Sequence, residues 1–143
     1  MQTAENILEN YIKINNIRKS TQRNVILDVF LKTEKHLTTE ELSALVKKEN
    51  PAIGNATVYR AIKIICGAGL AEEIDIGDGK KRYEHKYDHR HHDHLICIKC
   101  NEFIEFFDPE IEKLQEKILK KYNFTAINHK LQINGICKKC RGK

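Results

Sequence analysis

The sequence predicts an α+β protein with a helical first unit, a polar hinge and a small α/β second unit. Two observations indicate this order. Apolar residues recur at helical spacing in the first part of the 143-residue chain, and the pattern changes to strand-like alternation near residue 95. Between them, residues 85–94 are polar and rich in histidine. We therefore expect domains over 1–84 and 95–143, with the hinge over 85–94.

Four helices are expected in the first unit. Apolar faces predict them over residues 4–15, after Ser20-Thr21, after Thr39 as the N-cap, and near 55–67. Two strand-like segments follow, LAEEIDI and KKRYEH, and the GDG between them is typical of a hairpin turn. Helices followed by a hairpin are the layout of a winged helix-turn-helix, whose last long helix can enter the major groove of DNA.

The second unit is expected to contain three strands and one helix. HLICIKC and EFIEFF alternate like strands, residues 109–122 have one apolar helical face, and FTAINHKLQI is predicted to be the third strand. So small a unit needs a staple or a partner chain for stability.

The composition is that of a globular cytoplasmic protein without a membrane partner. Charged residues make up 31% of the chain and hydrophobic residues 41%. No apolar run approaches the ~20 residues of a membrane helix, and MQTAENILEN lacks the features of a secretory signal. The formal charge of +5 is compatible with nucleic-acid binding but does not by itself indicate it.

Four of the five cysteines form two CxxC pairs, Cys97 with Cys100 and Cys137 with Cys140. In a reducing compartment such pairs indicate a metal rather than disulfides, and four thiolates are a ligand set of structural zinc. A thioredoxin-like redox pair opens a helix, and neither pair is expected to do so. The sequence therefore predicts a structural Zn(II) ion, with Cys66 packed in the core.

Residues 89–94 read HRHHDH, which matches the H-x-H-x-D-H signature of metallo-β-lactamase-like hydrolases. The chain is too short for such an enzyme, so we expect no enzyme. In an extended segment His92 and His94 face one way and His91 and Asp93 the other, which gives ligand pairs for two sites. Imidazole and carboxylate together suit iron, manganese, zinc or nickel. The alternative interpretation is a solvated polar linker.

HHDHLICIKC, preceded by ATVYRAI and followed by CKKC, closely resembles the ferric uptake regulator (Fur) family of metal-dependent bacterial repressors. The resemblance extends from about Arg18 to Cys140. It implies a homodimer, with higher oligomers left open. Each chain would have an N-terminal DNA-binding domain and a C-terminal dimerisation domain. The implied partner is double-stranded DNA with an AT-rich palindromic operator.

The resemblance also implies three metal sites. The structural zinc falls on the four CxxC cysteines. The regulatory site falls on His36, Glu84, His92, His94 and Glu105. A second site in the dimerisation domain falls on His91, Asp93, Glu112 and His129. The spacing from Glu84 to His92 is longer than is usual in iron-sensing members, so His85, Asp88 and His89 are alternatives to Glu84.

Residues that contact DNA are implied as well. Tyr59 and Arg60 match the family's TVYR pair in the major groove, and Arg18 matches a basic residue that enters an AT-rich minor groove. Polar residues of the fourth helix and basic residues of the wing complete the set: Asn55, Thr57, Lys63, Lys80, Lys81 and Arg82.

Two features favour Fe(II) as the corepressor of an iron-homeostasis regulator. Glu105 stands where the family's peroxide sensors have aspartate. Zinc sensors of the family usually have a cysteine in the regulatory site, and no cysteine lies near residues 75–92 here. Mn(II) and Zn(II) are further candidate ions for this site in vitro. The alternatives are a peroxide-, zinc- or manganese-sensing member of the family, or a metal-binding or storage module that never meets DNA.

Overall fold

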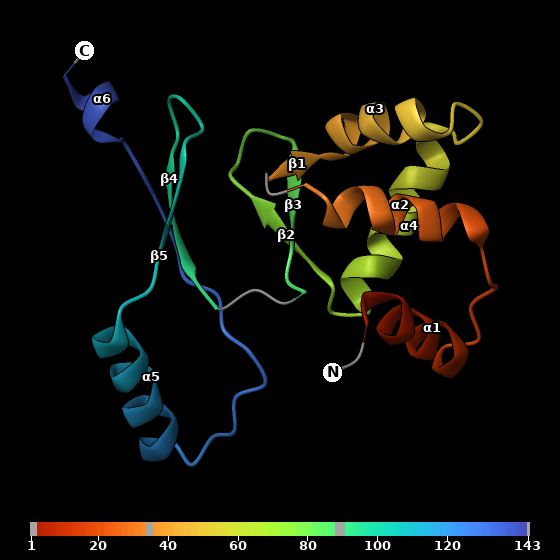
Figure 1. Cartoon of the computed structure of the whole chain (residues 1–143). Helices are drawn as coiled ribbons and strands as arrows, with labels where there is room; N and C mark the ends of the chain where they lie inside the picture. Colours follow the sequence, from red (N-terminus) through yellow and green to blue (C-terminus); the bar gives the residue numbers. More distant parts are fainter. Residues whose placement is uncertain (1–2, 34–35, 88–90, 143) are drawn as a thin grey trace. The chain divides into compact units, whose positions relative to one another are not determined.

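The computed structural model describes residues 3–33, 36–87 and 91–142, and the chain divides into two compact units, Met1–His89 and Arg90–Lys143. The described part contains six helices and two three-stranded sheets (Figure 1). This confirms the predicted α+β class, with a helical first unit and a small α/β second unit. Of the helices in these residues, none has the length and apolar character needed to cross a membrane.

The first unit contains four helices, α1 (Ala4–Ile14), α2 (Thr21–Leu31), α3 (Thr39–Glu49) and α4 (Asn55–Gly67). All four were expected, but the cap of α3 differs by one residue. Thr38 rather than Thr39 is the N-cap, and it forms a capping box with Glu41. A capping box needs a glutamate or glutamine three residues after the cap. Thr38 has one there, whereas Thr39 is followed at that distance by Leu42.

One buried core joins the helices of the first unit to its sheet. Side chains at most 1% exposed include Leu8, Phe30, Leu42, Ile62 and Tyr83. Burial of each large apolar side chain contributes about 1.5–3 kcal/mol to stability. Cys66 is half-buried and packs against this core, in agreement with its predicted place.

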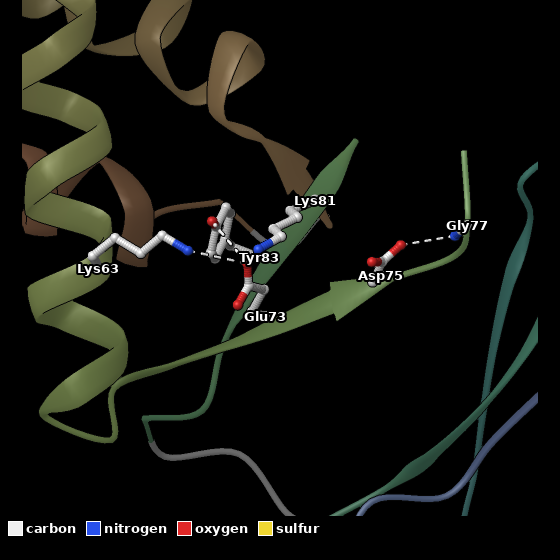
Figure 2. Close-up of polar contacts among 6 residues, drawn as sticks. All are labelled: Lys63, Glu73, Asp75, Gly77, Lys81 and Tyr83. Carbon is white, nitrogen blue, oxygen red and sulfur yellow. Dashed lines mark hydrogen bonds and ion pairs between the residues drawn. The ribbon is translucent and has the colours of Figure 1, made fainter. Parts of the chain in front are cut away.

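The sheet of the first unit has the strand order β1-β3-β2. β2 (Ala71–Asp75) and β3 (Lys81–His85) form the predicted hairpin. Its turn holds Gly77 and Gly79 at φ of 84° and 82°, and Asp75 Oδ1 accepts the Gly77 N–H at 2.8 Å (Figure 2). β1 (Leu37–Thr38) pairs with β3. A two-residue strand has no periodicity, so the sequence does not predict β1.

In the second unit β4 (Asp93–Cys97) lies between β5 (Phe103–Phe106), which is antiparallel to it, and β6 (Gln132–Gly135), which is parallel. α5 (Pro109–Lys121) connects β5 to β6, and α6 (Lys138–Arg141) follows β6. The strand predicted from FTAINHKLQI is wrong for most of its length. Its register with β4 begins at Gln132 opposite His94, so residues 124–131 have no strand to pair with.

The segment expected to be a hinge, residues 85–94, is partly strand. His85 is the last residue of β3, and Asp93 and His94 begin β4. Asp88 and His89, two of the alternatives to Glu84, lie outside the described residues. The proposed domain limits therefore remain a prediction.

Gly67, the last residue of α4, lies against Tyr11 of α1. A Cβ at this position would come within 2.9 Å of Tyr11 Cζ and closer still to the hydroxyl oxygen. We expect Gly67→Ala to lower the free energy of unfolding by about 1–3 kcal/mol, because overpacking outweighs a gain in helix propensity of at most ~1 kcal/mol. In a Tyr11→Ala background the same change should be neutral or stabilising. Urea unfolding of the four proteins tests this, and equal destabilisation in both backgrounds would contradict it.

Candidate metal centres and nucleic-acid interface

The four CxxC cysteines converge at one end of the sheet of the second unit. Each contributes a sulfur to a group whose members all lie within 4.8 Å of one another, and Cys100 Sγ is 3.7 Å from Cys137 Sγ. Four thiolates placed about 2.3 Å from a tetrahedral zinc ion have sulfurs about 3.8 Å apart. The ligand type, number and spacing therefore fit zinc.

The parallel pairing of β4 with β6 brings the two CxxC pairs together. Cys97 is the register partner of Gly135, so Cys137 lies two residues beyond that pair. The Cys137 N–H donates to Cys97 Sγ at 3.4 Å, and this bond, with that from the Cys100 backbone, lowers the pKa of the Cys97 thiol to about 6. The thiolate is the form that binds metal.

The second CxxC pair opens a short helix, contrary to the expectation from sequence. Cys137 is the N-cap of α6 and Cys140 lies within it. The residues after Cys137 are free to turn because β6 has already ended at Gly135. Because Cys137 opens a helix, the sequence-based argument that excluded a redox pair does not apply to Cys137 and Cys140. The convergence of four sulfurs, where a redox pair uses two, is what indicates a metal centre.

A second group of donors joins three segments of the second unit. His91 Nε2 lies 3.2 Å from Asp93 Oδ1 and 3.4 Å from Glu112 Oε1. His129 Nε2 lies 3.8 Å and 3.5 Å from the same two oxygens. Donors about 2.1 Å from a tetrahedral ion are about 3.4 Å apart. All four residues predicted for the second site are therefore brought together at metal-binding distances.

The burial of Asp93 is the strongest chemical sign of a cation in this group. Its side chain is 0% exposed, and neither carboxylate oxygen has a hydrogen-bond partner among the described residues. Glu112 Oε1 and His129 Nε2 are also buried without one. A buried carboxylate is costly unless it is paired or coordinates a metal. The residues present fit a divalent cation.

Two residues predicted for the regulatory site meet in the first unit. His36 Nε2 is 2.7 Å from Glu84 Oε2, because the next pair in register after the β1–β3 ladder is His36 opposite Glu84. His85 follows on the opposite face of β3, where its ring meets the edge of Phe30 at 5.8 Å. Among the described alternatives, Glu84 is therefore the residue that accompanies His36.

The other three regulatory residues meet in the second unit. His94 on β4 is the register partner of Glu105 on β5. His92 Nε2 is 3.6 Å from Glu105 Oε1, and the rings of His92 and His94 have centroids 4.8 Å apart. Strand alternation predicted this histidine pair from sequence.

The residues predicted to contact DNA through α4 lie on its exposed side. Asn55 and Arg60 are exposed, Tyr59 is 50% exposed and Thr57 is half-buried. The hydroxyl of the buried Ser43 donates to Asn55 Oδ1 at 2.5 Å, which fixes the first side chain of the helix. Arg18, before α2, is exposed as well.

A hollow of about 700 Å³ separates this side of α4 from the wing. Its lining includes Lys47, Asn55, Tyr59, Lys80 and Lys81. Arg82 is less available than expected, because it is paired with Asp78 at 3.0 Å and is 12% exposed. Lys63 and Lys81 both pair with Glu73. The sequence did not point to Glu73, although the hairpin register places it opposite Tyr83.

Comparisons with known proteins agree with this geometry. The model of the family described as "Ferric uptake regulator family" matches residues 14–134. The ferric uptake regulation protein of Neisseria gonorrhoeae is 37% identical, with 100% of this chain and 98% of that protein covered. The structure of the Helicobacter pylori ferric uptake regulator, reported with three functional metal binding sites, gives a TM-score of 0.80 at 32% identity, covering 98% of this chain and 95% of that one. The Vibrio cholerae ferric uptake regulator, with rearranged DNA-binding domains, gives 0.71 at 36% identity, covering 90% and 98%. This chain belongs to the ferric uptake regulator family.

Proposed function

We propose that this protein is a metal-responsive transcriptional repressor that binds operator DNA with Fe(II) as its corepressor. Family membership supports a metal-responsive regulator. The observation that carries the choice of iron is the donor set of the regulatory residues, in which imidazoles and carboxylates occur without a thiolate. Such donors suit Fe(II) and Mn(II), whereas thiolates favour zinc. Glu105, in place of the aspartate of the peroxide sensors, favours iron sensing over peroxide sensing.

The proposed switch follows from the division of the ligands between the units. His36 and Glu84 belong to the first unit, and His92, His94 and Glu105 to the second. We propose that all five bind one Fe(II) ion. Such an ion favours the arrangements of the units that allow all five to bind, and it shifts the population towards them. If these arrangements also bind the operator best, Fe(II) and DNA raise each other's affinity reciprocally.

The other two clusters have different proposed roles. The four CxxC cysteines would hold a structural zinc ion that closes the second unit around β4 and β6. His91, Asp93, Glu112 and His129 would hold a further divalent cation that neutralises the buried Asp93 and ties α5 to the sheet. Neither site requires chemistry beyond ligand binding, and no enzymatic activity is proposed.

DNA binding is proposed for the exposed side of α4, the wing and Arg18. Tyr59 would contact a thymine methyl group, and Arg60 a phosphate or guanine, in the major groove. Asn55, Thr57 and Lys63 lie on the same helix, and Lys80 and Lys81 would contact phosphates from the wing. A module that only stores metal would not need an exposed tyrosine and arginine on α4.

A homodimer is proposed from the apolar surface of the second unit. Ile104, Leu95 and Ile133 are register neighbours that form a row across the sheet, and they are 43%, 36% and 51% exposed. α5 has no buried residue, and its Leu114 and Ile118 are exposed. Exposed apolar residues gathered in this way on the sheet and on α5 mark an interaction site. A second copy of the chain offers the same surface and would cover it symmetrically.

The choice of corepressor can be tested by operator binding. In an anaerobic titration at fixed salt, protein that keeps its structural zinc should bind an AT-rich palindromic duplex about 5- to 150-fold more tightly when Fe(II) is added, the usual range of allosteric coupling. Mn(II) should replace Fe(II). His36→Ala should abolish the response because it removes a ligand from the first unit. Fluorescence anisotropy at buffered free metal concentrations measures the affinity.

A matched variant separates the repressor from a metal-storage module. Arg60→Ala should weaken operator binding by roughly 10- to 100-fold, the loss expected for one specific contact, while metal stoichiometry stays unchanged. Operator affinity that is indifferent to Fe(II), or that responds only to traces of Zn(II), would overturn the iron assignment.

The four-cysteine site can be tested by removing one of its ligands. Cys100→Ser should remove one zinc ion per chain and unfold the second unit, because the thiolates that join the end of β4 to α6 are lost. Elemental analysis and limited proteolysis measure the two effects. Cys66→Ser is the control and should keep the zinc. Retention of zinc by the Cys100 variant would contradict the assignment.

The proposed dimer can be tested by placing a charge on its interface. Leu114→Glu should convert the protein to monomers in sedimentation velocity, because it places a charge on the apolar face of α5 without disturbing a buried contact. Lys113→Ala changes the net charge equally at an exposed position nearby and should remain dimeric. A dimer that persists in the Leu114 variant would place the interface elsewhere.

A further inference from the structure

Three hydrogen-bond donors converge on a single oxygen of Glu73 in the first unit (Figure 2). The distances to Glu73 Oε1 are 3.2 Å from Lys63 Nζ, 3.1 Å from Lys81 Nζ and 3.4 Å from the Tyr83 hydroxyl. The donors come from two elements, since Lys63 is on α4 and the other two are on β3. Glu73 on β2 thus links the helix proposed to enter the major groove to the base of the wing.

The hydrogen bonds and ion pairs of Glu73 can be replaced by contacts with another anion at small cost. A carboxylate oxygen has about two lone-pair sites, so three donors cannot all bond well to Glu73 Oε1 at once. The side chains are 32–52% exposed, and ion pairs in such positions contribute little to stability. One lysine can therefore leave Glu73 for another anion at small cost in free energy.

The carboxyl group of Glu73 and the ammonium group of Lys63 are both charged at neutral pH. Partial burial would raise the pKa of its carboxyl group, but hydrogen bonds from Lys81 and Lys63 lower it overall. The pKa of Lys63 is raised despite the opposing effect of burial, because Glu73 and Tyr83 stabilise its charge. Both partners of the pair are thus ionised.

The position of the group connects it with DNA binding. Lys63 Nζ lies 5.6 Å from the centre of the Tyr59 ring and 5.9 Å from that of Tyr83. Tyr59 and Lys81 both line the 700 Å³ hollow between α4 and the wing. Both lysines that Glu73 binds are among the residues proposed to contact DNA, and Lys81 is among those proposed to contact phosphates.

We propose that Glu73 is a positioning and specificity-determining residue that competes with DNA phosphate for Lys63 and Lys81. The inference rests on the proposed DNA binding. With Glu73 in place, the two lysines and the carboxylate carry a net charge of one. Contacts to phosphate strengthen binding to every sequence alike. By limiting them, Glu73 leaves a larger share of the binding free energy to contacts that read bases, such as those proposed for Tyr59 and Arg60.

The test compares Glu73→Gln with Glu9→Gln. Each substitution removes one negative charge, but Glu9 is exposed on α1 and forms no ion pair within the described residues. Binding to a random-sequence duplex and to the metal-dependent operator is measured by anisotropy between about 50 and 200 mM salt. The slope of log K against log salt should become steeper by about 0.9–1.8 in the Glu73 variant, one or two extra phosphate contacts. Its operator-to-random affinity ratio should fall, and the Glu9 variant should match the wild type.

A residue that only stabilised the hairpin would not change the salt slope. Unchanged melting of Glu73→Gln by circular dichroism confirms folding. The triple variant that adds Lys63→Gln and Lys81→Gln must lose the gained slope. Equal slopes for the Glu73 and Glu9 variants, with operator binding still metal-dependent in the wild type, would overturn this inference alone. A wild type that binds neither duplex would overturn the proposed function as well.

Discussion

The alternation of side chains along residues 91–97 is the constraint on which the second unit depends. A strand presents successive side chains to opposite faces. His91 and Asp93 therefore turn to one group of donors, and His92 and His94 to the other. A shift of one residue in the pairing of β4 would exchange the two faces. The register of β4 thus determines which side chains face each of these two donor groups. The same strand ends at Cys97, the first residue of the four-cysteine group.

β3 has a comparable role in the first unit. It carries Glu84 beside His36 near one end and Lys81 in the ion pair with Glu73 at the other. A proposed metal ligand and a candidate DNA contact therefore belong to a single strand, held between β1 and β2. In the proposed regulation, metal binding at Glu84 and DNA contact at the wing would therefore both act on the backbone of β3.

The helices of the first unit could be predicted because helical periodicity and caps are local signals. Strand alternation likewise gave the pairing of His92 with His94. Glu112 and His129 could be assigned only through the family resemblance, since they come from segments far from the hinge. Three features depend on which strands pair: β1, the extent of β6 and the helix opened by Cys137. The residue pattern within a single strand does not show which strand it pairs with. Glu73 was missed because a charged residue on a half-exposed strand looks like solvated surface until its neighbours are placed.

The parallel pairing of β4 with β6 has a consequence for how the protein assembles. β4 and β5 are close in sequence and join as a hairpin, whereas β6 reaches β4 only after the chain has passed through β5 and α5. Contacts between distant segments form late, because the entropy cost of closing a long loop comes before the stabilisation that the contacts provide. We therefore expect Cys97 and Cys100 to meet zinc first as a two-sulfur site, and the other two cysteines to complete the tetrahedron as the last step of folding. Completion of the zinc site and closure of the chain are then one event.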